Sequence, residues 1–454
     1  MIGEVAGPDV LIEQVDAGLK IAGHSLVSAC CLCRRQVWAF RLAPLHQARE
    51  RQPRKGNDAM LAITNARILT ITDGEIPSGT VLIDDGKISA VGAEVSIPEE
   101  AEVIDAEGMW LTPGLIDAHS HVGVYGEPMT FASSDGNEMT DPITPHLRGM
   151  DSFDPNDRAI PDVVQGGVTA LYTQPGSANV IGGTGLMVKL VGRTVEEMRV
   201  PGVEHMKMAL GENPKRVYGE MKKMAPATRM ASAAKLREAL IDAQNYLDKW
   251  EEWEAGSEED RKKGRPGREL GKEMLGKVLT GQMKARIHCH RADDMMTAIR
   301  IAEEFNLDFS LEHATEGYKI ADILADKQVP CIVGPLLLSR MKMEVQDITL
   351  KNPGILSRAG VKVCIQMDGF SDTQWLALHA GLAVREGMPE EEAFKSITLY
   401  PAQLLGVEDR MGSIEAGKDA DLALFDGHPF HTYTRCQKVL IDGAVVFDRD
   451  SDCC

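Results

Sequence analysis

Two histidines separated by one residue end a short apolar run at 111–121, LTPGLIDAHSH. Side chains two positions apart on a β-strand point to the same face, so His119 and His121 can bind one metal ion together. Pro113 and Gly114 precede the run, as expected where a linker enters a buried strand. The sequence therefore predicts a metal-binding strand end here.

Three further apolar, strand-like runs end in polar side chains. They close on IHCH at 287–290, LEH at 311–313 and QMD at 366–368. Together with ITLYPAQLLG at 397–406 and MGSIEAGKDADLALFD at 411–426, this series resembles the amidohydrolase superfamily, most closely its imidazolonepropionase-like branch. The combination is much more specific than an isolated HxH pair.

The resemblance extends from about Met60 to Asp448 and implies an α/β fold. It implies a (β/α)8 TIM barrel at 114–407 and a small β-sandwich formed by the segments before and after the barrel, 60–113 and 408–454. The residues agree with the sandwich strands, because β-rich runs in both outer segments are broken by Asp-Gly pairs typical of hairpins. These pairs lie at 73–74, 85–86 and 442–443.

Within the expected barrel, strand-like and helix-like runs alternate, as a parallel barrel requires. A helix is expected from about Ser232 to Trp253, followed by an exposed charged loop at 256–269. The eight expected strands lie at 115–121, 167–174, 186–191, 203–210, 285–290, 308–313, 329–333 and 361–368.

The candidate ligands all lie at the C-terminal ends of expected strands, where the active sites of such barrels are built. For His119 and His121 the alternative is a pair of core histidines, but three further polar strand ends argue against it. The resemblance makes His288 and His313 metal ligands. It places His290 against the substrate, with support of a ligand as the alternative. Glu312 is expected to point the other way and to be structural.

Asp368 is the residue we expect to transfer protons. Beside a divalent cation, its carboxylate can bind the metal, accept a proton from the bound water and deliver it to a departing amine. Met367 and Gly369 differ from the residues often found at these positions in related sequences, which leaves the base unaffected but weakens any substrate inferred from them.

Lys207, in HMKMALGENP, raises three alternatives. In binuclear relatives a lysine at this place carries a carbamate that bridges two metals, and this is the role we favour. Glu212 could supply a carboxylate instead. The third alternative is a single metal, with Lys207 only ion-paired. The expected cofactor is therefore Zn²⁺, one or two per chain, with another divalent metal as the alternative.

Two loops after expected strands look specialised. The stretch at 133–151 is long, polar and poor in helix signals, which is typical of a binding loop. Within it, His146 and Arg148 could contact an anionic group of the substrate, the alternative being an ordered surface loop. The stretch QPGSANVIGGTG at 174–185 lacks both phosphate-binding glycine patterns, so we interpret it as backbone that lies close to the metal centre.

Composition excludes several classes of protein. The net charge of -19 argues against nucleic-acid and anionic-membrane partners. Nine cysteines without regular spacing do not indicate a disulfide framework, so we expect a cytoplasmic protein. No apolar run approaches the ~20 residues that span a bilayer. We expect a small-molecule substrate and a homo-oligomer.

Residues 1–59 fall outside the family pattern. We interpret them as an N-terminal extension with little fixed structure. The alternative, a metal or redox site at Cys30, Cys31 and Cys33, lacks a nearby second Cys/His pair to complete four ligands.

These observations predict a metal-dependent hydrolase of a non-peptide amide or cyclic amide in a small molecule, acting through a metal-activated hydroxide with Asp368 as proton carrier. Deamination of a heterocycle or cleavage of a small dipeptide would use the same parts. A degenerate barrel that serves as a scaffold is the non-enzymatic alternative, but such proteins have typically lost ligands, and this chain retains the set.

Overall fold

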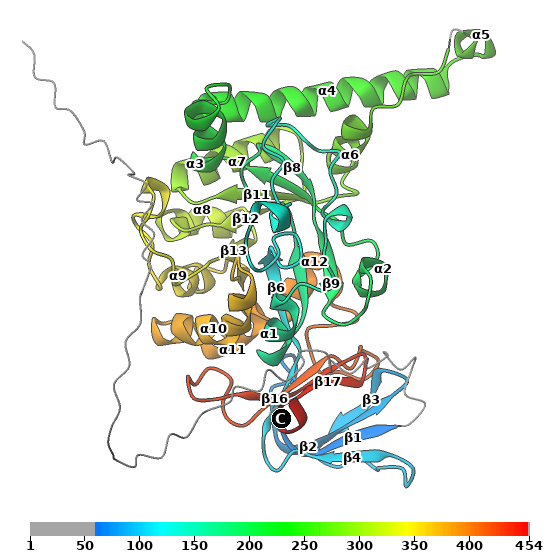
Figure 1. Ribbon diagram of the computed structural model, residues 1–454, viewed down its shortest axis with the longest axis vertical. Helices are drawn as coiled ribbons and strands as arrows, with labels where there is room; N and C mark the ends of the chain where they lie inside the picture. Colours follow the sequence, from blue (N-terminus) through cyan, green and yellow to red (C-terminus); the bar gives the residue numbers. More distant parts are fainter. Residues whose placement is uncertain (1–59, 263, 453–454) are drawn as a thin grey trace, which may run out of the picture. The chain divides into compact units, whose positions relative to one another are not determined.

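The computed structural model describes residues 60–262 and 264–452 (Figure 1). They belong to one structural unit, Gln52–Cys454. The extension expected at 1–59, with its cysteines, lies outside the described residues.

An eight-stranded sheet draws its strands from both ends of the described chain (Figure 1). Its order is β17-β16-β15-β5-β1-β2-β3, and β4 also pairs with β1. Strands β5 and β15 are antiparallel, with Thr112 opposite Ala423. The bounds are β1 Leu61–Leu69, β2 Glu75–Asp84, β3 Lys87–Gly92, β4 Glu102–Asp105, β5 Trp110–Pro113, β15 Leu422–Phe425, β16 Cys436–Ile441 and β17 Ala444–Asp448.

Two tight turns in this sheet confirm the hairpins expected from Asp-Gly pairs. Asp85 and Gly86 join β2 to β3, and Asp442 and Gly443 join β16 to β17; φ is positive at all four residues. This conformation matches the twist of paired strands and favours Gly at the second position. The described strands of this region form one sheet, so the two-layered sandwich stays a prediction.

The remaining strands form two mixed sheets. The larger has the order β14-β13-β12-β11-β10-β8, and the smaller has the order β6-β7-β9. Most neighbours are parallel, and helices connect many of them, which gives an α/β fold. The bounds are β6 Leu115–Ser120, β7 Val168–Thr173, β8 Ile181–Thr184, β9 Leu186–Lys189, β10 Met206–Ala209, β11 Ala285–Cys289, β12 Phe309–His313, β13 Cys331–Val333 and β14 Val363–Ile365.

Backbone hydrogen bonds join the two sheets along two seams. Asp368 N donates to His119 O (3.2 Å), which links the segment after β14 to β6. Gly185 N donates to His205 O (3.1 Å), which links the start of β9 to the segment before β10. Ladder pairing among the described strands nevertheless does not run unbroken around a ring, so the closed barrel expected from the sequence is not shown.

The chain reverses where the third barrel strand was expected. Instead of one strand at 186–191, the structure has β8 and β9, which are antiparallel to β10 and β7 respectively. The stretch 174–185, interpreted from its glycines as a loop, therefore contains a strand. The glycines allow close approach of backbones there: a Cβ at Gly183 would lie 2.5 Å from Leu147 O.

Helices lie between the strands and pack on the sheets. The expected helix at 232–253 is α4, which begins three residues earlier, after Thr228, whose side chain accepts a hydrogen bond from Ala231 N. The charged stretch 256–269 was expected to be only loop, but Ser257 caps the short helix α5 within it. The bounds are α1 Ala159–Gln165, α2 Val195–Met198, α3 Glu212–Lys215, α4 Arg229–Ala255, α5 Glu258–Arg261, α6 Leu270–Leu279, α7 Ala292–Glu304, α8 Ala321–Asp326, α9 Asn352–Arg358, α10 Leu376–Arg385, α11 Glu390–Ser396, α12 Leu399–Leu405 and α13 Arg449–Asp452.

Burial explains why the strands of the two mixed sheets read as nearly continuous apolar runs. Every residue of β6, β7, β10 and β11 is buried, as in parallel strands covered on both faces. A polar side chain in such a strand must find a partner inside the protein. None of the helices in the described part of the chain is long and apolar enough to cross a membrane.

Candidate active site

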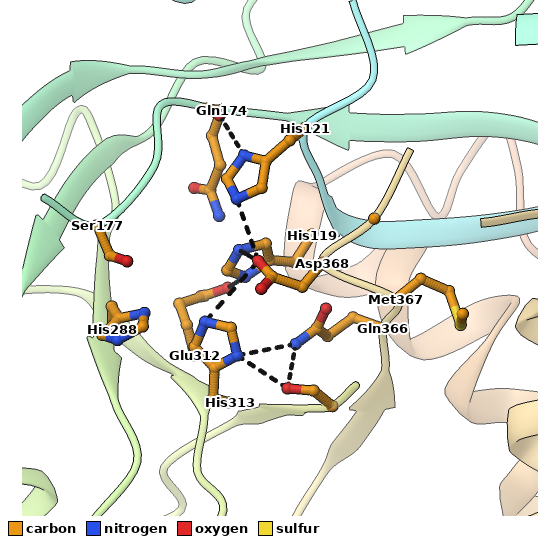
Figure 2. Close-up of polar contacts among 12 residues, drawn as sticks. His119, His121, Gln174, Ser177, His288, Glu312, His313, Gln366, Met367 and Asp368 are labelled. Atoms are coloured by element: carbon orange, nitrogen blue, oxygen red, sulfur yellow. Dashed lines mark hydrogen bonds and ion pairs between the residues drawn. The ribbon is translucent and has the colours of Figure 1, made fainter. Parts of the chain in front are cut away.

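Five histidines and one aspartate from four strand ends form a group, which we call the histidine cluster: His119, His121, His288, His290, His313 and Asp368. The histidines are buried and Asp368 is partly exposed; Figure 2 labels every member except His290. The ligand atoms of His288, His290 and His313 all lie within 4.8 Å of one another. The same holds for His119, His313 and Asp368. The structure therefore brings together residues separated by up to 249 positions in the sequence.

Asp368 Oδ1 is the point on which three imidazoles converge. It lies 3.0 Å from His119 Nε2, 3.1 Å from His121 Nε2 and 3.9 Å from His313 Nε2. The Asp368 side chain is 30% exposed, whereas the His119 side chain is fully buried. Asp368 thus contacts the histidines while part of its side chain stays exposed.

The other ring nitrogen of each converging histidine has an oxygen partner. Nδ1 lies 2.6 Å from Glu312 Oε2 in His119, 2.8 Å from the Gln174 carbonyl in His121, and 2.8 Å from the Gly334 carbonyl in His313. Carbonyl and carboxylate oxygens accept hydrogen bonds, so we assign the proton to Nδ1 in His119 and His121. His313 Nδ1 lies closer to the Gly334 carbonyl (2.8 Å) than to the Gln366 amide nitrogen (3.2 Å), so we assign the proton to Nδ1 there as well. Each Nε2 then presents a lone pair toward Asp368.

This arrangement fits a divalent metal. Three imidazole lone pairs and a carboxylate oxygen face one another without a proton between them, which is unfavourable in a buried site unless a cation lies among them. Burial also lowers the pKa of His119, and it lowers the pKa of His313 to about 3, which keeps both rings neutral. Neutral imidazoles with a carboxylate are a ligand set that suits zinc.

Two members of the cluster adopt a backbone conformation that is uncommon for residues other than glycine. The angle φ is 68° at His313 and 52° at Asp368, both at the ends of their strands. Such positions cost of order 1–3 kcal/mol each and concentrate at functional sites. The turn at His313 breaks the alternation of the strand, so both Glu312 and His313 reach His119.

Glu312 is more closely tied to the cluster than the sequence suggested. Its carboxylate accepts hydrogen bonds from Arg286 Nε (3.0 Å) and Nη2 (2.9 Å), and from Ser310 Oγ (2.8 Å). Glu312 and Arg286 are both fully buried, and the guanidinium lies over the Tyr172 ring at 4.4 Å. A carboxylate that orients a ligand histidine in this way raises its basicity and fixes its tautomer.

His288 and His290 occupy the other side of the cluster. The rings of His288 and His313 are 4.4 Å apart, and those of His290 and His313 are stacked at 4.6 Å. His290 Nδ1 lies 2.8 Å from Thr315 Oγ1, whereas His288 Nδ1 is buried without a hydrogen-bond partner among the described residues. The structure brings both rings into the cluster, and their expected roles as a ligand and a substrate contact stay predictions.

Lys207 lies inside the cluster and is 1% exposed. Its Nζ is 3.3 Å from His119 Nε2, and burial lowers its pKa to about 8. Glu212, the alternative anionic ligand, donates its backbone N–H to Glu344 Oε2 (2.8 Å). The closely spaced ligand groups found in the described chain do not include Glu212.

The two residues expected to contact substrate lie elsewhere on the loop at 133–151. His146 is exposed and lies beside the first turn of α6, near Gly271. Arg148 is exposed and forms an ion pair with Asp151 (2.7 Å). Neither contacts the histidine cluster in the part of the chain that the structure describes, and their role in substrate binding stays a prediction.

A signal for the Glu312–Arg286 contact exists in the sequence. Arg286 lies two positions before His288 on a buried strand, so it shares the face of that histidine and needs an anionic partner. The parallel pairing places His288 beside Glu312 on the next strand. A search for the partner of the buried arginine would therefore have reached Glu312.

Comparison with known proteins gives the family. The family model described as "Amidohydrolase family" matches residues 345–450. A crystal structure of an amidohydrolase from Thermotoga maritima is 43% identical with a TM-score of 0.81, covering 86% of this chain and all of that one. The chain therefore belongs to the amidohydrolase family and is a hydrolase that acts on carbon–nitrogen bonds.

Two curated relatives extend this comparison. An amidohydrolase of Hapsidospora irregularis is 31% identical over 82% of this chain, but the chain spans only 40% of that relative's length. An imidazolonepropionase of Mesorhizobium japonicum is 25% identical over 82% of this chain and 93% of the relative. The imidazolonepropionase-like resemblance of the sequence is confirmed.

Proposed function

We propose that this protein is a metal-dependent amidohydrolase that hydrolyses the carbon–nitrogen bond of a non-peptide amide or cyclic amide in a small molecule. The observation that carries the proposal is the convergence of three histidine Nε2 atoms on Asp368 Oδ1. The substrate specificity of a fold is set by its loops, so the family alone does not supply the reaction.

The residues that would hold the metal are His119, His121, His288, His313 and Asp368. A bound divalent metal would polarise the substrate carbonyl and make a water molecule more acidic. Zinc is the first candidate because four of these ligands are imidazoles. The family and the ligand set are compatible with one or two metals per chain.

Lys207 is the residue we propose as the source of a further anionic ligand. A carbamate formed on its Nζ would place two oxygens where the amine now lies, 3.3 Å from His119 Nε2. An unmodified ammonium would repel a cation at this position. Glu212 remains the alternative ligand, and a single metal remains the alternative stoichiometry.

Asp368 would move the proton. Its carboxylate accepts a proton from water as the water oxygen bonds to the carbonyl carbon, and it gives this proton to the amine nitrogen as the carbon–nitrogen bond breaks. His290, whose Nδ1 contacts Thr315, would present its other nitrogen to the substrate.

We place this chemistry at the mouth of a (β/α)8 barrel spanning 114–407, with 60–113 and 408–454 forming a composite sandwich. The two backbone seams between the mixed sheets support the barrel, and the pairing of β5 with β15 supports the composite domain. A cytoplasmic homo-oligomer that binds neither nucleic acid nor membranes remains the expectation from the sequence.

The decisive experiment combines metal analysis with a substrate panel. Purified protein should contain one to two equivalents of divalent metal per chain, and a panel of amides, lactams, dipeptides and aminated rings should show hydrolysis only of amides or lactams. Chelator-treated protein, and the same protein with zinc restored, provide the control. Ammonia release from aminated rings alone would replace the proposal with a deaminase, and a chain that binds no metal would contradict it.

A further inference from the structure

Four side chains line the histidine cluster on the side of His288, and we call them the polar wall: Ser177, Asn213, Lys342 and Glu344. They come from the segments that follow β7, β10 and β13. Asn213 Nδ2 donates to Ser177 Oγ (2.8 Å), and Lys342 Nζ donates to Asn213 Oδ1 (3.1 Å). Figure 2 shows Ser177 beside His288 and apart from Gln366.

The polar wall is in direct contact with the histidines. Asn213 Nδ2 lies 3.4 Å from His288 Nε2, and Glu344 Oε1 lies 3.6 Å from His290 Nε2. A small substrate whose amide carbon lies in the cluster must therefore extend along this wall on one side.

Lys342 is the wall's cation, and it has bonding capacity left. An ammonium carries three protons. Two acceptors are found for Nζ among the described residues, Asn213 Oδ1 and Glu344 Oε1 (2.5 Å). The Lys342 side chain is 24% exposed, unlike Lys207, so solvent and ligands can reach it.

Glu344 holds this cation in place. Its side chain is 2% exposed, and Oε2 accepts the backbone N–H of Glu212 at 2.8 Å. Because Glu344 is fixed by the backbone at the start of α3, Lys342 is kept beside the histidines instead of extending into solvent. A preorganised cation loses little entropy when it binds an anion.

The side of the cluster next to His121 has a different character. The Tyr125 ring lies 5.3 Å from the His121 ring, and the Phe370 ring lies 6.0 Å from Tyr125 in an edge-to-face arrangement. Aromatic faces favour apolar or aromatic groups of a ligand. The cluster is thus bounded by a cation on one side and by aromatic rings on the other.

We propose that Lys342 binds a carboxylate of the substrate. The substrate class is then an amide with a carboxylate on one side of the scissile bond and an apolar or aromatic group on the other, as in an N-acylated amino acid. This inference rests on the proposed function for the scissile bond, but the binding of the carboxylate is independent of turnover.

The test uses a pair of probes that lack an amide at the scissile position, and chromatography of the titrated samples checks that the primary amide probe is not hydrolysed to the acid. 3-Benzoylpropanoate has the shape of an N-benzoylated glycine with a methylene in place of the amide nitrogen, and its primary amide is the uncharged partner. Calorimetric titration of the metal-containing protein should give about tenfold to hundredfold tighter binding of the acid, because charge-assisted hydrogen bonds are stronger than neutral ones.

Variants of Lys342 assign this preference to one residue. Lys342→Met should abolish the discrimination between acid and amide, and Lys342→Arg should retain most of it. Lys351→Met is the matched control, since Lys351 is an exposed lysine of the same connection between β13 and α9 and should leave the preference unchanged.

Glu344→Gln provides a test that does not remove the lysine. It eliminates the carboxylate that competes for Lys342 but keeps an oxygen for the Glu212 N–H, so binding of the acid should become severalfold tighter. If the Lys342–Glu344 pair served only to fix the loop, Glu344→Gln would not tighten the binding of the acid. This variant also decides the matter where Lys342→Met fails to fold because Glu344 is left buried and unpaired.

Three outcomes would each overturn the assignment. The wild type could bind acid and amide equally, it could show no binding of the acid up to the solubility limit, or the preference could survive in Lys342→Met. Preferential acid binding in a protein that hydrolyses none of the amide panel would leave the carboxylate site standing and refute the hydrolytic function instead.

Discussion

The histidine cluster and a second, partly buried polar group, which we call the acidic cluster, look alike as sets of side chains that could bind a metal. The acidic cluster contains Asp419, Asp421 and Asp442, whose carboxylate oxygens lie within 4.8 Å of one another. Lys189, at the end of β9, fills its centre and lies 2.9 Å from Asp419 Oδ2 and 2.9 Å from Asp421 Oδ2. It also pairs with Asp442.

The difference lies in what neutralises each group. In the acidic cluster Lys189 already neutralises the carboxylates. Burial alone would lower the pKa of Lys189, but the negative charges of the three aspartates outweigh burial and raise it. In the histidine cluster the lone pairs of three rings face a carboxylate, and Lys207 contacts a ring nitrogen instead of an acid. A group of potential ligands is therefore a metal site only where the protein leaves their charge and lone pairs uncompensated.

The largest effect should follow from removing two ligands of the histidine cluster. The double variant His119→Ala, His121→Ala is expected to lose stoichiometric metal and all measurable turnover, because two of the converging Nε2 atoms are gone. Metal analysis by mass spectrometry checks it. His428→Ala, at a half-buried histidine that packs against Trp110, is the control and should keep its metal. Full metal content in the double variant would contradict the assignment of the histidine cluster as the metal site.

Asp368→Asn separates proton transfer from metal binding. The amide is nearly isosteric and still offers an oxygen, so most of the metal should remain, but it cannot accept a proton at neutral pH. Turnover should fall about 10²- to 10⁴-fold, the usual contribution of a general base. Metal content and turnover are measured on one preparation, with Asp372→Asn as the control from the same segment. Near-normal turnover by a metallated Asp368→Asn protein would direct the search for the base to His290 or Glu212.

Lys189→Met should test the acidic cluster in the opposite way, through stability and not through metal. Removing the cation leaves buried carboxylates unpaired, which typically costs about 3–5 kcal/mol in the free energy of unfolding. Urea unfolding monitored by circular dichroism measures it. Lys87→Met removes a half-exposed partner of Asp419 and should cost less than about 1 kcal/mol. Equal losses of unfolding free energy in Lys189→Met and Lys87→Met would mean that the burial of Lys189 does not strengthen its pairing with the carboxylates.

The destabilisation in Lys189→Met should also depend on pH. Burial raises the pKa of Asp421 to about 6, so above that pH the ionised Asp421 lowers the free energy of unfolding. Burial also raises the pKa of Asp419, but Lys189 and other cations outweigh this effect and lower that pKa to about 2. The stability that ionised Asp419 contributes is therefore present above its unfolded pKa and is lost as the pH falls toward 2. Without Lys189 both carboxylates should take up protons more readily. The difference from the wild type should therefore shrink between about pH 7 and pH 5, and a constant or growing difference would contradict this assignment.

The smallest effect is expected at Glu312. Glu312→Gln keeps an oxygen near His119 Nδ1 but removes the negative charge that orients the ring, which should weaken metal affinity about 10- to 100-fold in the folded protein. It also leaves the buried Arg286 without its anionic partner, so the free energy of unfolding should fall and is measured alongside. Chelator competition measures the affinity, and the absorption spectrum of the cobalt-substituted protein reports the ligand field. Ser310→Ala, which removes a different hydrogen bond to the same carboxylate, should leave both nearly unchanged. If Glu312→Gln bound the metal as tightly as the wild type, the contact between Glu312 and His119 would have no influence on metal binding.

The sequence predicted the features that depend on local patterns. Alternating apolar runs gave the strand positions closely, since β6, β11 and β12 lie within their expected ranges. The residues of the histidine cluster could be singled out because they lie at or just after the ends of buried strands, and their roles as metal ligands stay predictions. Strand β9 lies within the range expected for the third strand, but β8 and the antiparallel direction of both strands were missed, because strand direction depends on the neighbouring strands and not on the local residue pattern. Glu312 was misplaced because the positive φ at His313 is set by the tertiary structure. The polar wall was missed entirely, since its members come from three segments that carry no common motif.

The pairing of β5 with β15 has a consequence for how the chain is made. Thr112 meets Ala423, so the edge of β5 stays open while 310 intervening residues are synthesised. At bacterial-to-eukaryotic elongation rates of about 5–20 residues per second, this interval lasts roughly 15 to 60 s. An unpaired strand edge exposed for that time can pair with a neighbouring nascent chain. A strand made late thus covers the edge of a strand made early, and truncation before β15 is expected to leave that edge open to other chains.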